Sequence, residues 1–452
     1  MKIIIAGAGR IGSSVAEALV AKGHDLTIIE NDPDTVLGIS NNVDAICVSG
    51  NATNPNVLRD AGAEEADIIL AITQHDEVNM LCGITAMKLG TKQAIVRVRD
   101  PQYTAGEAHL LSDLFGFSLI INPEYECAKQ ISRLLRFPGA SRVHSFSHGS
   151  IEIAEHHVAA GSMLSDTALK DLEKISGVKV LVSLIERDHE AIIPKGNITF
   201  KEGDTLSLTG SDADLRKFFS ACNAYKNKVK STLIVGGGTT SVYLARMLTK
   251  IGISVTVIEK DRSRCEALCD LIPDCRIVCG DATMSEVLIE EGVRTTDSFV
   301  ALTDDDGENI ITSIYAHKCG AKRIVTLVAH EHFTEVAESS ELDSVVTPKS
   351  TVVDQIISYV EGTSNSQGYS FDLLYRLADG KAEAIELRIE EQEGLTGIPL
   401  KSLKLNKDIL IVGIVRGGKT ILPDGDSVLL PGDHIIVSAT AGAVRSAENL
   451  LL

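Results

Sequence analysis

Residues 1–32, MKIIIAGAGRIGSSVAEALVAKGHDLTIIEND, decide the fold of this chain. Residues 2–6 form a short apolar run, which is typical of a buried parallel strand. Gly7, Gly9 and Gly12 follow in the spacing G-x-G-x-x-G, where the strand would turn into a helix. The first glycine permits the tight turn, the second lets the backbone approach a pyrophosphate, and the third lets the helix pack closely on the strand. The helix would point its free amide groups at the phosphates.

A second strand, residues 26–29, ends in Glu30, which lies 18 positions after Gly12 (30 − 12). An acid at this position accepts hydrogen bonds from both hydroxyls of an adenosine ribose and repels a 2′-phosphate. A glycine-rich turn without a ligand is the alternative interpretation. Because the strand, the helix and the acid all stand at the spacing of a dinucleotide site, the sequence favours nucleotide binding.

The composition excludes several classes of partner. Of the 452 residues, 44% are hydrophobic, as in ordinary globular proteins, and the length suggests about three or four domains. The net charge of −19 argues against nucleic acid and anionic lipid, because neither attracts an acidic surface. No apolar run is long enough to cross a bilayer, and no secretion signal is visible. The nine scattered cysteines indicate reduced thiols, so we expect a cytoplasmic location.

The chain repeats itself. Strands and helices alternate after residue 32, which predicts a parallel, doubly wound sheet with helices on both faces. A second glycine turn begins at Gly236, 229 positions after Gly7 (236 − 7), and Glu259 lies the same distance after Glu30 (259 − 30). GDAT at 280–283 also answers GNAT at 50–53. Matching glycines and acids at one offset indicate an internal duplication.

A smaller segment follows each of the two large ones, and the two small segments match each other. PKG at 194–196 and PDG at 423–425 share the offset of 229 (423 − 194). Short strands around one or two helices predict small α+β lobes. The predicted fold class is therefore α/β, with two Rossmann-type doubly wound parallel sheets, each followed by a small α+β lobe. The predicted domains are Rossmann lobes at 1–137 and 226–362 and small lobes at 138–225 and 363–452, with linkers at 224–230 and 362–368.

With these residues in place, the chain resembles the TrkA family along essentially its whole length. The phrases that carry the resemblance are GAGRIG (7–12), IEND (29–32), AITQHDEVNMLCG (71–83), RVRDPQY (97–103), GGGTTS (236–241), IEKD (258–261), GDAT (280–283) and ALTDDDGENI (301–310). Members of this family are cytoplasmic subunits of the bacterial and archaeal Trk potassium uptake system, built from two tandem regulator-of-potassium-conductance (RCK) units. The resemblance implies a ring, typically a homotetramer, beneath a membrane channel subunit of the TrkH type. It further implies that NAD(H) and ATP or ADP bind and so gate potassium flow.

The resemblance also implies nucleotide contacts at the positions that match the family's motifs. In the first unit these are Gly7, Ala8, Gly9, Arg10, Ile11, Gly12, Glu30, Asn51, Ala52, Thr53, Thr73, Gln74 and Arg97. In the second unit they are Gly236, Gly237, Gly238, Thr239, Thr240, Glu259, Asp281, Thr303 and Asp304. The glycine turns would hold phosphates, the glutamates the ribose, and the residues after the later strands the adenine and the sheet crevice.

The second unit departs from the pattern at three positions. Ser241 replaces the third glycine, although its small side chain is compatible with close packing. Thr239 replaces Arg10, and Leu327 replaces Arg97. The second pocket thus lacks two positive charges that the first offers to phosphate oxygens. We therefore expect the first site to bind charged nucleotides more tightly than the second.

Several other residues have a plain structural interpretation beside a functional one. Cys265, Cys269, Cys275 and Cys279 form two C-x3-C pairs, but zinc sites have tighter spacing, so core thiols are favoured over a metal site. The histidines at 156, 157, 330 and 332 have no ligand pattern. Glu124 and the acids at 304–306 open expected helices, where a negative charge suits the helix dipole or caps the first turn.

Two classes of function remain open, a ligand-sensing regulatory subunit and an NAD-dependent oxidoreductase. A dehydrogenase needs a substrate domain with a proton donor that faces the nicotinamide. The expected small lobes are short and contain no His-Asp or Tyr-Lys pairing for that role. The sequence therefore favours the regulatory subunit, with no catalytic residues and no metal.

Overall fold

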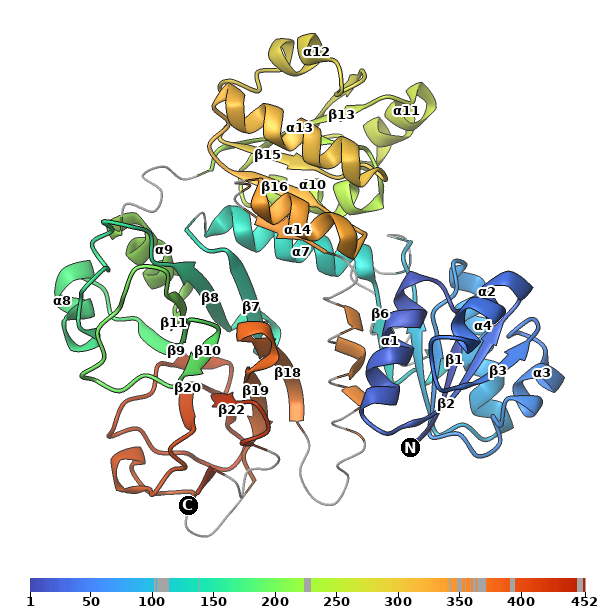
Figure 1. The fold of residues 1–452 in the computed structure, drawn as a ribbon, viewed down its shortest axis with the longest axis horizontal. Coiled ribbons are helices and arrows are strands. Elements are labelled where there is room, and N and C mark those ends of the chain that lie inside the picture. Colours follow the sequence, from blue (N-terminus) through green and yellow to red (C-terminus); the bar gives the residue numbers. More distant parts are fainter. Residues whose placement is uncertain are drawn as a thin grey trace.

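The chain was analysed as a computed structural model (Figure 1). The structure describes residues 1–100, 103, 114–137, 139–222, 229–340, 342, 344–347, 352–353, 355–357, 359–360, 363, 371–390, 395–444 and 450–451. They form two six-stranded parallel sheets and two five-stranded antiparallel sheets. The fold class predicted from the sequence is confirmed. The two predicted linkers lie largely outside the described residues. The sequence also predicts a helix at 441–450, but residues 441–444 form a turn, and 445–449 lie outside the described residues.

The first unit has the strand order β3-β2-β1-β4-β5-β6. Its elements are β1 (Lys2–Ala6), α1 (Arg10–Ala21), β2 (Asp25–Glu30), α2 (Pro33–Ser40), β3 (Ile46–Ser49), α3 (Pro55–Asp60), β4 (Ile68–Ala71), α4 (Asp76–Leu89), β5 (Gln93–Arg97) and β6 (Leu119–Ile121). The order reverses between β1 and β4, and ligands bind in such sheets at the carboxyl ends of the strands at this switch point.

The second unit has the same strand order, β14-β13-β12-β15-β16-β17. Its elements are β12 (Ser231–Val235), α10 (Thr239–Lys250), β13 (Ser254–Glu259), α11 (Arg262–Leu271), β14 (Arg276–Cys279), α12 (Ser285–Glu290), β15 (Ser298–Ala301), α13 (Asp306–Cys319), β16 (Ile324–Leu327), α14 (Glu331–Ser339) and β17 (Ser344–Val346). Matching capping residues start matching helices, because Asp32 caps α2 and Asp261 caps α11 through their side chains.

Each small lobe is one antiparallel sheet, with orders β10-β9-β11-β8-β7 and β18-β19-β22-β20-β21. The first lobe contains β7 (Arg142–Phe146), β8 (Ile151–His157), α8 (Leu172–Ser176), β9 (Leu181–Arg187), β10 (Glu190–Ile192), β11 (Thr205–Gly210) and α9 (Asp212–Ala221). The second contains β18 (Phe371–Leu377), β19 (Ala382–Arg388), β20 (Ile409–Arg416), β21 (Lys419–Ile421) and β22 (His434–Thr440). The two lobes lie side by side (Figure 1) and share a core in which Phe146 and Ile151 meet Leu377 and Val412.

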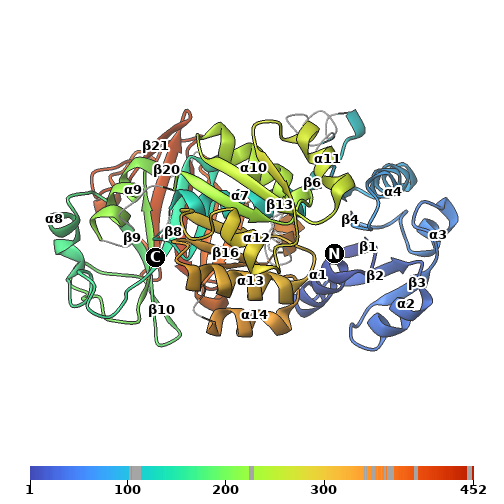
Figure 2. The ribbon, with the colours of Figure 1, turned by 90° about the horizontal axis from the view of Figure 1, so that it is seen from above.

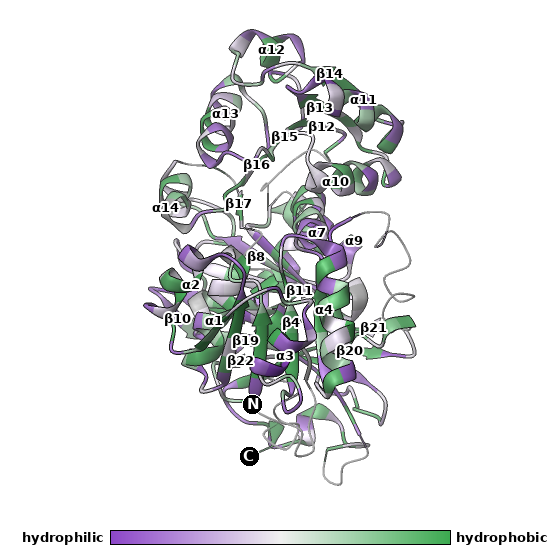
Figure 3. Ribbon diagram, turned by 90° about the vertical axis from the view of Figure 1, so that its right-hand side faces the viewer, coloured by the Kyte–Doolittle hydropathy of each residue, from purple (hydrophilic) through white to green (hydrophobic). Residues whose placement is uncertain are grey.

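The two Rossmann units exchange helices. Helix α7 (Pro123–Arg136) leaves the first sheet and packs along α10 of the second unit (Figures 1 and 2), where the rings of Tyr125 and Tyr243 are 5.2 Å apart. The Tyr243 hydroxyl also donates to the carbonyl oxygen of Arg99 at 2.9 Å. In return, helical residues between 352 and 360 join the apolar core around α1. The hydrophobic residues follow the central strands of the sheets (Figure 3), so each unit keeps its own core beside this shared one.

Candidate nucleotide-binding sites

The first glycine turn joins β1 to α1. Gly7 has a φ of +104°, which a residue with a side chain rarely adopts, and a Cβ added at Gly12 would lie 2.1 Å from the Gly7 carbonyl oxygen. Gly9, the N-cap residue of α1, has a φ of −65°, and an added Cβ there would meet no atom within 4 Å. The turn needs glycine at position 7, and its geometry in the first unit leaves no room for a side chain at position 12. At position 9 the backbone is left open toward the space beyond the helix.

Glu30 stands at the end of β2, opposite this turn. Its Oε2 accepts a hydrogen bond from the Ala8 backbone N–H at 2.7 Å, and its Oε1 accepts from the N–H groups of Asn31 at 2.7 Å and Asp32 at 3.1 Å. Three backbone donors hold the carboxylate in one orientation. Its remaining lone pairs are available to hydroxyl donors of a ligand.

A buried asparagine fixes the loop after β4. Asn79, at the start of α4, accepts hydrogen bonds from the Thr73 N–H and hydroxyl, both at 2.7 Å, and donates to the carbonyl oxygens of Thr73 and Arg97. The second unit repeats this arrangement, since Asn309 bonds Thr303 and donates to the Leu327 carbonyl oxygen at 3.1 Å. The same bond in each unit places Leu327 at the position that Arg97 occupies in the first.

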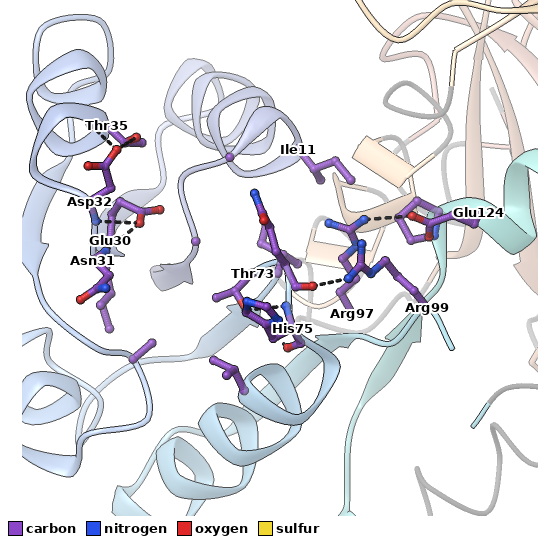
Figure 4. Close-up of a pocket in the computed structure, with 18 of the residues that line it drawn as sticks. Ile11, Glu30, Asn31, Asp32, Thr35, Thr73, His75, Arg97, Arg99 and Glu124 are labelled. Atoms are coloured by element: carbon purple, nitrogen blue, oxygen red, sulfur yellow. Dashed lines mark hydrogen bonds and ion pairs between the residues drawn. The ribbon is translucent and has the colours of Figure 1, made fainter. Parts of the chain in front are cut away.

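These elements surround a cavity of about 800 Å³ at the carboxyl ends of the first sheet (Figure 4). Of the residues predicted from the sequence, those that line it are Gly7, Gly9, Ile11, Glu30, Asn51, Ala52, Thr73, Gln74 and Arg97. Ala8, Gly12 and Thr53 are not in its wall, and the side chain of Arg10 lies outside the described parts of the structure. A cavity of this size at a switch point is the expected place for a nucleotide ligand.

The second unit forms part of this first cavity. Thr240, Thr303, Asp304, Leu327 and Ala329 all line it. The sequence assigned the first three of these residues only to the second site, because spacing within a repeat does not reveal which surfaces of two repeats meet. The cavity thus lies between the two Rossmann units rather than within one of them.

Two arginines form the cationic side of the cavity (Figure 4). Arg97 pairs with Glu124 at the start of α7, with Nη2 and Oε1 3.1 Å apart, while Arg99 lies 3.6 Å from the Asp76 carboxylate and donates to the Gln74 carbonyl oxygen. Burial lowers the pKa of Arg97, against the opposing effect of Glu124. The Arg97 Nε and the Glu124 Oε2 are buried and have no hydrogen-bond partner among the described residues. The Nε atom itself has almost no accessible surface, but other atoms of the Arg97 side chain line the cavity, and its positive charge favours an anionic group such as a phosphate.

The second site is smaller and more acidic. Its cavity of about 270 Å³ is lined by predicted residues Gly236, Gly237, Gly238, Glu259, Asp281, Thr303 and Asp304, and also by Lys260, Asp305 and Glu308. Thr239 and Thr240 are not in its wall. Ser241 donates its hydroxyl to the Gly236 carbonyl oxygen at 2.6 Å, so the serine is accommodated in this turn by a hydrogen bond. Arg264 of α11 is not in the wall of this cavity, and it donates to the Gly237 carbonyl oxygen at 2.7 Å.

Several residues that line the first cavity were not predicted. His75, Arg99 and Pro123 had no assigned role, and Glu124 was interpreted as an acid at a helix start. Arg99 lies two positions after Arg97, on the same face of an extended chain, and this spacing was the available signal. No sequence signal links Glu124 to Arg97, because the contact depends on how α7 leaves the sheet.

The interpretation of the four cysteines at 265–279 as core thiols is wrong in part. Cys265 is buried, but Cys269 and Cys279 are exposed and Cys275 is intermediate. Within the described residues, no group of three or more His, Cys, Asp or Glu side chains is placed to hold a metal ion. Of the histidines, His330 pairs with Asp306 at 2.7 Å, and His156 bonds the Gly139 carbonyl oxygen at 2.7 Å. Asp305 caps α13, as the helix-start interpretation expects.

Comparison with known proteins covers both halves of the chain. The TrkA-N domain model matches residues 3–123 and 232–348, and the TrkA-C domain model matches residues 153–223 and 384–452. The Trk system potassium uptake protein TrkA homolog of Archaeoglobus fulgidus is 33% identical over 450 residues, which is 100% of both chains. The Trk system potassium uptake protein TrkA of Vibrio alginolyticus is 30% identical over 443 residues, 97% of this chain and 95% of the relative.

Solved structures show the same fold. The GsuK channel is 18% identical with a TM-score of 0.65, over 99% of this chain and 77% of that chain. The GsuK RCK domain has a TM-score of 0.63, over 99% of this chain and 93% of that chain, and the GsuK channel bound to NAD has a TM-score of 0.63, over 99% and 77%. None of the helices in the described part of this chain is long and apolar enough to span a membrane.

Proposed function

The chain belongs to the TrkA family, and from this premise we propose that it is a nucleotide-sensing regulatory subunit that gates a membrane potassium channel. In this proposal its ligands are NAD(H) and ATP or ADP, its partner is a channel subunit of the TrkH type, and the subunit is not an enzyme. Four copies form a ring on the inner face of the membrane, held there through the channel. Each copy contributes two tandem RCK units.

The first cavity carries this proposal. It combines an open backbone at Gly9, a carboxylate held by three N–H groups at Glu30 and the positive charge of the Arg97 side chain in its wall. These groups suit the pyrophosphate, the ribose hydroxyls and a further anionic group of an adenine nucleotide. Gly9 and the α1 N-terminus would hold the phosphates, and Glu30 would hold the ribose.

Occupation of this cavity would be felt by both Rossmann units, because Thr240, Thr303 and Asp304 of the second unit line it. A ligand shifts a conformational equilibrium only if it contacts one arrangement better than another. A nucleotide that touches both walls meets this condition, since its contacts depend on the angle between the units. Helix α7 begins beside the cavity at Glu124 and runs on to the small lobe, so it offers a route to the rest of the ring.

Potassium flux through the partner channel tests this function. The purified channel is reconstituted in liposomes, the full chain is added, and NAD+, NADH, ADP and ATP are supplied in turn. We expect flux to change with at least one nucleotide, and to stop responding when the chain carries Gly9→Ala and Glu30→Ala. Flux that is the same with and without the chain, under every nucleotide, would contradict the proposal.

The same preparation tests for dehydrogenase activity. The cationic side of the first cavity consists of Arg97 and Arg99, and His75 is the histidine in its wall. With candidate hydroxy- or oxo-acids as substrates, we expect no steady, substrate-dependent loss of the NADH absorbance at about 340 nm. Sustained turnover would instead favour an oxidoreductase, with His75 as its first candidate proton donor.

A further inference from the structure

Two cysteines of the second unit lie on either side of the acid that the second site would use. Cys265 is in α11, and its Sγ donates to the carbonyl oxygen of Glu259 at 3.3 Å. Cys279 ends β14 and is the register partner of Glu259 in the parallel pair β13–β14. The neighbouring Cys279 side chain raises the pKa of Cys265, so the two thiols influence each other beside the end of β13. Neither thiol has a role in the proposed function, and the described residues around them provide no metal site.

We propose that Cys265 and Cys279 are a modification site, at which a low-molecular-weight disulfide oxidises the two thiols to an intramolecular disulfide that weakens nucleotide binding at the second site. The part that concerns binding rests on the proposed function. The part that concerns the disulfide rests only on the placement of the two thiols.

Exposure assigns an order to the two sulfurs. Cys279 is exposed and Cys265 is buried, with 7% of its surface accessible. Burial raises the pKa of Cys265 to about 11, and the neighbouring Cys279 acts in the same direction. Cys265 therefore stays a protonated thiol that an external reagent reaches poorly. Cys279 is the thiol that meets the reagent, and Cys265 is the one that resolves the adduct.

The chemistry is two successive thiol–disulfide exchanges. The Cys279 thiolate attacks one sulfur of a disulfide RSSR, which forms Cys279–S–SR and releases RS⁻. The Cys265 sulfur, on losing its proton, then attacks the Cys279 sulfur, forms the Cys265–Cys279 bond and releases the second RS⁻. The two protons from the protein thiols end on the two thiolates as 2 RSH. RSSR is reduced and the cysteine pair is oxidised, and contact between the thiols compensates for the high pKa of the second attacker.

The disulfide would weaken nucleotide binding because α11, which carries Cys265, also supports the glycine turn of the second site. Arg264, the neighbour of Cys265, donates to the Gly237 carbonyl oxygen at 2.7 Å, and Leu268 packs so closely that a Cβ added at Gly237 would lie 2.5 Å from its Cδ1. A disulfide of about 2.05 Å is shorter than a non-bonded contact between two sulfur atoms, so its formation pulls α11 toward the end of β14. That movement displaces the contacts that support the glycine turn. Asp281, two residues after Cys279, lines the same cavity.

The duplication supplies an internal comparison. Val36 and Ser49 of the first unit correspond to Cys265 (265 − 229) and Cys279 (279 − 230). The first site therefore lacks the pair, and the same oxidant should leave it unaffected. Oxidation would thus act on one site of the two.

Peptide mapping of the full chain tests the modification. The reduced protein is incubated with oxidised glutathione, digested without reductant and analysed by mass spectrometry. We expect a Cys265–Cys279 crosslink that dithiothreitol reverses. Cys265→Ser should stop at a glutathione adduct on Cys279, Cys279→Ser should give neither product, and Cys269→Ser, an exposed cysteine of the same helix, should keep the crosslink. Absence of the crosslink from the unsubstituted chain, or its formation only together with crosslinks to Cys269, overturns the proposal.

Calorimetric titration tests the effect on binding. ADP is titrated into reduced and oxidised protein that carries Glu30→Ala, so that the heat reports the second site. We expect oxidation to weaken binding about tenfold, within the usual range for coupling between sites, and Cys279→Ser to abolish the difference. Unchanged affinity with a complete disulfide overturns the effect on binding. If the reduced protein binds no ADP, the second site of the proposed function fails, while the peptide map still decides the disulfide.

Val36→Cys with Ser49→Cys provides the matched gain of function. Installed in a chain with Cys265→Ser and Glu259→Ala, the new pair should form a crosslink with oxidised glutathione and make the first site sensitive to it. If the crosslink between the two introduced cysteines forms without any loss of ADP affinity at the first site, then movement of the helix toward the neighbouring strand does not weaken nucleotide binding.

Discussion

At the scale of single residues, the three glycines of the first turn have different reasons to be glycine. Gly7 is required by its backbone angle, and in this turn Gly12 leaves no room for a side chain, because an added Cβ would lie 2.1 Å from the Gly7 carbonyl oxygen. Among the described residues, no neighbour requires glycine at position 9. We therefore attribute the glycine at position 9 to the close approach of a ligand to the backbone.

Gly9→Ala should therefore separate binding from folding. We expect its free energy of unfolding to fall by less than about 1 kcal/mol, the cost of alanine at an N-cap, while nucleotide binding at the first site is lost. Gly12→Ala should instead cost about 1–3 kcal/mol through overpacking. Thermal unfolding and calorimetric titration of each variant measure the two effects. If Gly9→Ala binds nucleotide as well as the unsubstituted chain, the phosphates do not lie against the α1 N-terminus.

Glu30 and Glu259 offer a second comparison at this scale. Each accepts a backbone N–H from its glycine turn at 2.7 Å, but Arg97 lines the first cavity, whereas its counterpart Leu327 is not in the wall of the second. We expect Glu30→Ala to remove the tighter of two binding events and Glu259→Ala the weaker. Each loss should be about 1.5–3 kcal/mol, the range for a charge-assisted hydrogen bond. Stronger residual binding after loss of Glu30 than after loss of Glu259, in parallel calorimetric titrations, would reverse the assignment.

At the scale of elements, the two small lobes contain a matching ion pair, in which the carboxylate is buried and an arginine reaches it from a neighbouring strand. Asp204 accepts two hydrogen bonds of 2.7 Å from Arg187, and Asp433 accepts bonds of 2.8 and 2.7 Å from Arg416. Burial by itself would raise the pKa of Asp204, but the Arg187 hydrogen bonds and the Lys201 N–H outweigh it, and the pKa is lowered. The ionised carboxylate is therefore the form that the folded lobe stabilises.

Asp204→Asn should destabilise the chain by about 2–3 kcal/mol at pH 7, because it leaves Arg187 without its charged partner. The sign of the pH dependence follows from the lowered pKa. The contribution of Asp204 is present above its ordinary pKa of 3.8 and is lost as the pH falls through the lower, folded value. Denaturant unfolding at pH 7 and below pH 4 should thus show a difference between variant and parent that shrinks with acid. If the difference in free energy of unfolding between variant and parent is the same at both pH values, the destabilisation comes from altered packing of the side chain and not from the loss of its negative charge.

Sequence reasoning succeeded where one element follows another. The strand, glycine turn, helix and acid of residues 2–30 form the arrangement that their spacing predicts, and nine predicted residues of the first unit line one cavity. It failed where contacts depend on packing between distant elements. Glu124 meets Arg97 only because α7 crosses to the other unit, and Cys279 is exposed because it ends an edge strand. Periodicity carries no information on either event.

At the scale of the whole molecule, the helix exchange makes each half depend on the other. The face of α7 that carries Tyr125 is covered by α10, and the apolar core around α1 includes Val352, Ile356 and Val360. Separation of the halves would expose these apolar surfaces to water. Large exposed patches of this kind promote self-association.

Residues 1–225 expressed alone should therefore form dimers or aggregates rather than a stable monomer. Addition of residues 226–452, expressed separately, should recover a one-to-one complex with the hydrodynamic size of the intact chain. Sedimentation velocity distinguishes these species, and binding of the dye ANS reports the exposed apolar surface. A monomeric first half that binds no ANS would show that the exchanged helix is not needed to cover α1.

The covalent link between the two Rossmann units has a consequence for their evolution. Two subunits that meet by diffusion must keep enough affinity to find each other, whereas units on one chain face each other at an effective concentration in the millimolar range for a short flexible tether. Neither half then has to remain self-complementary. A substitution in a homodimer changes both subunits, whereas a substitution in this chain changes only one of the two units, as at Thr239, Ser241 and Leu327. Joining the copies end to end thus lets one half drift toward a new chemistry while the other preserves the old.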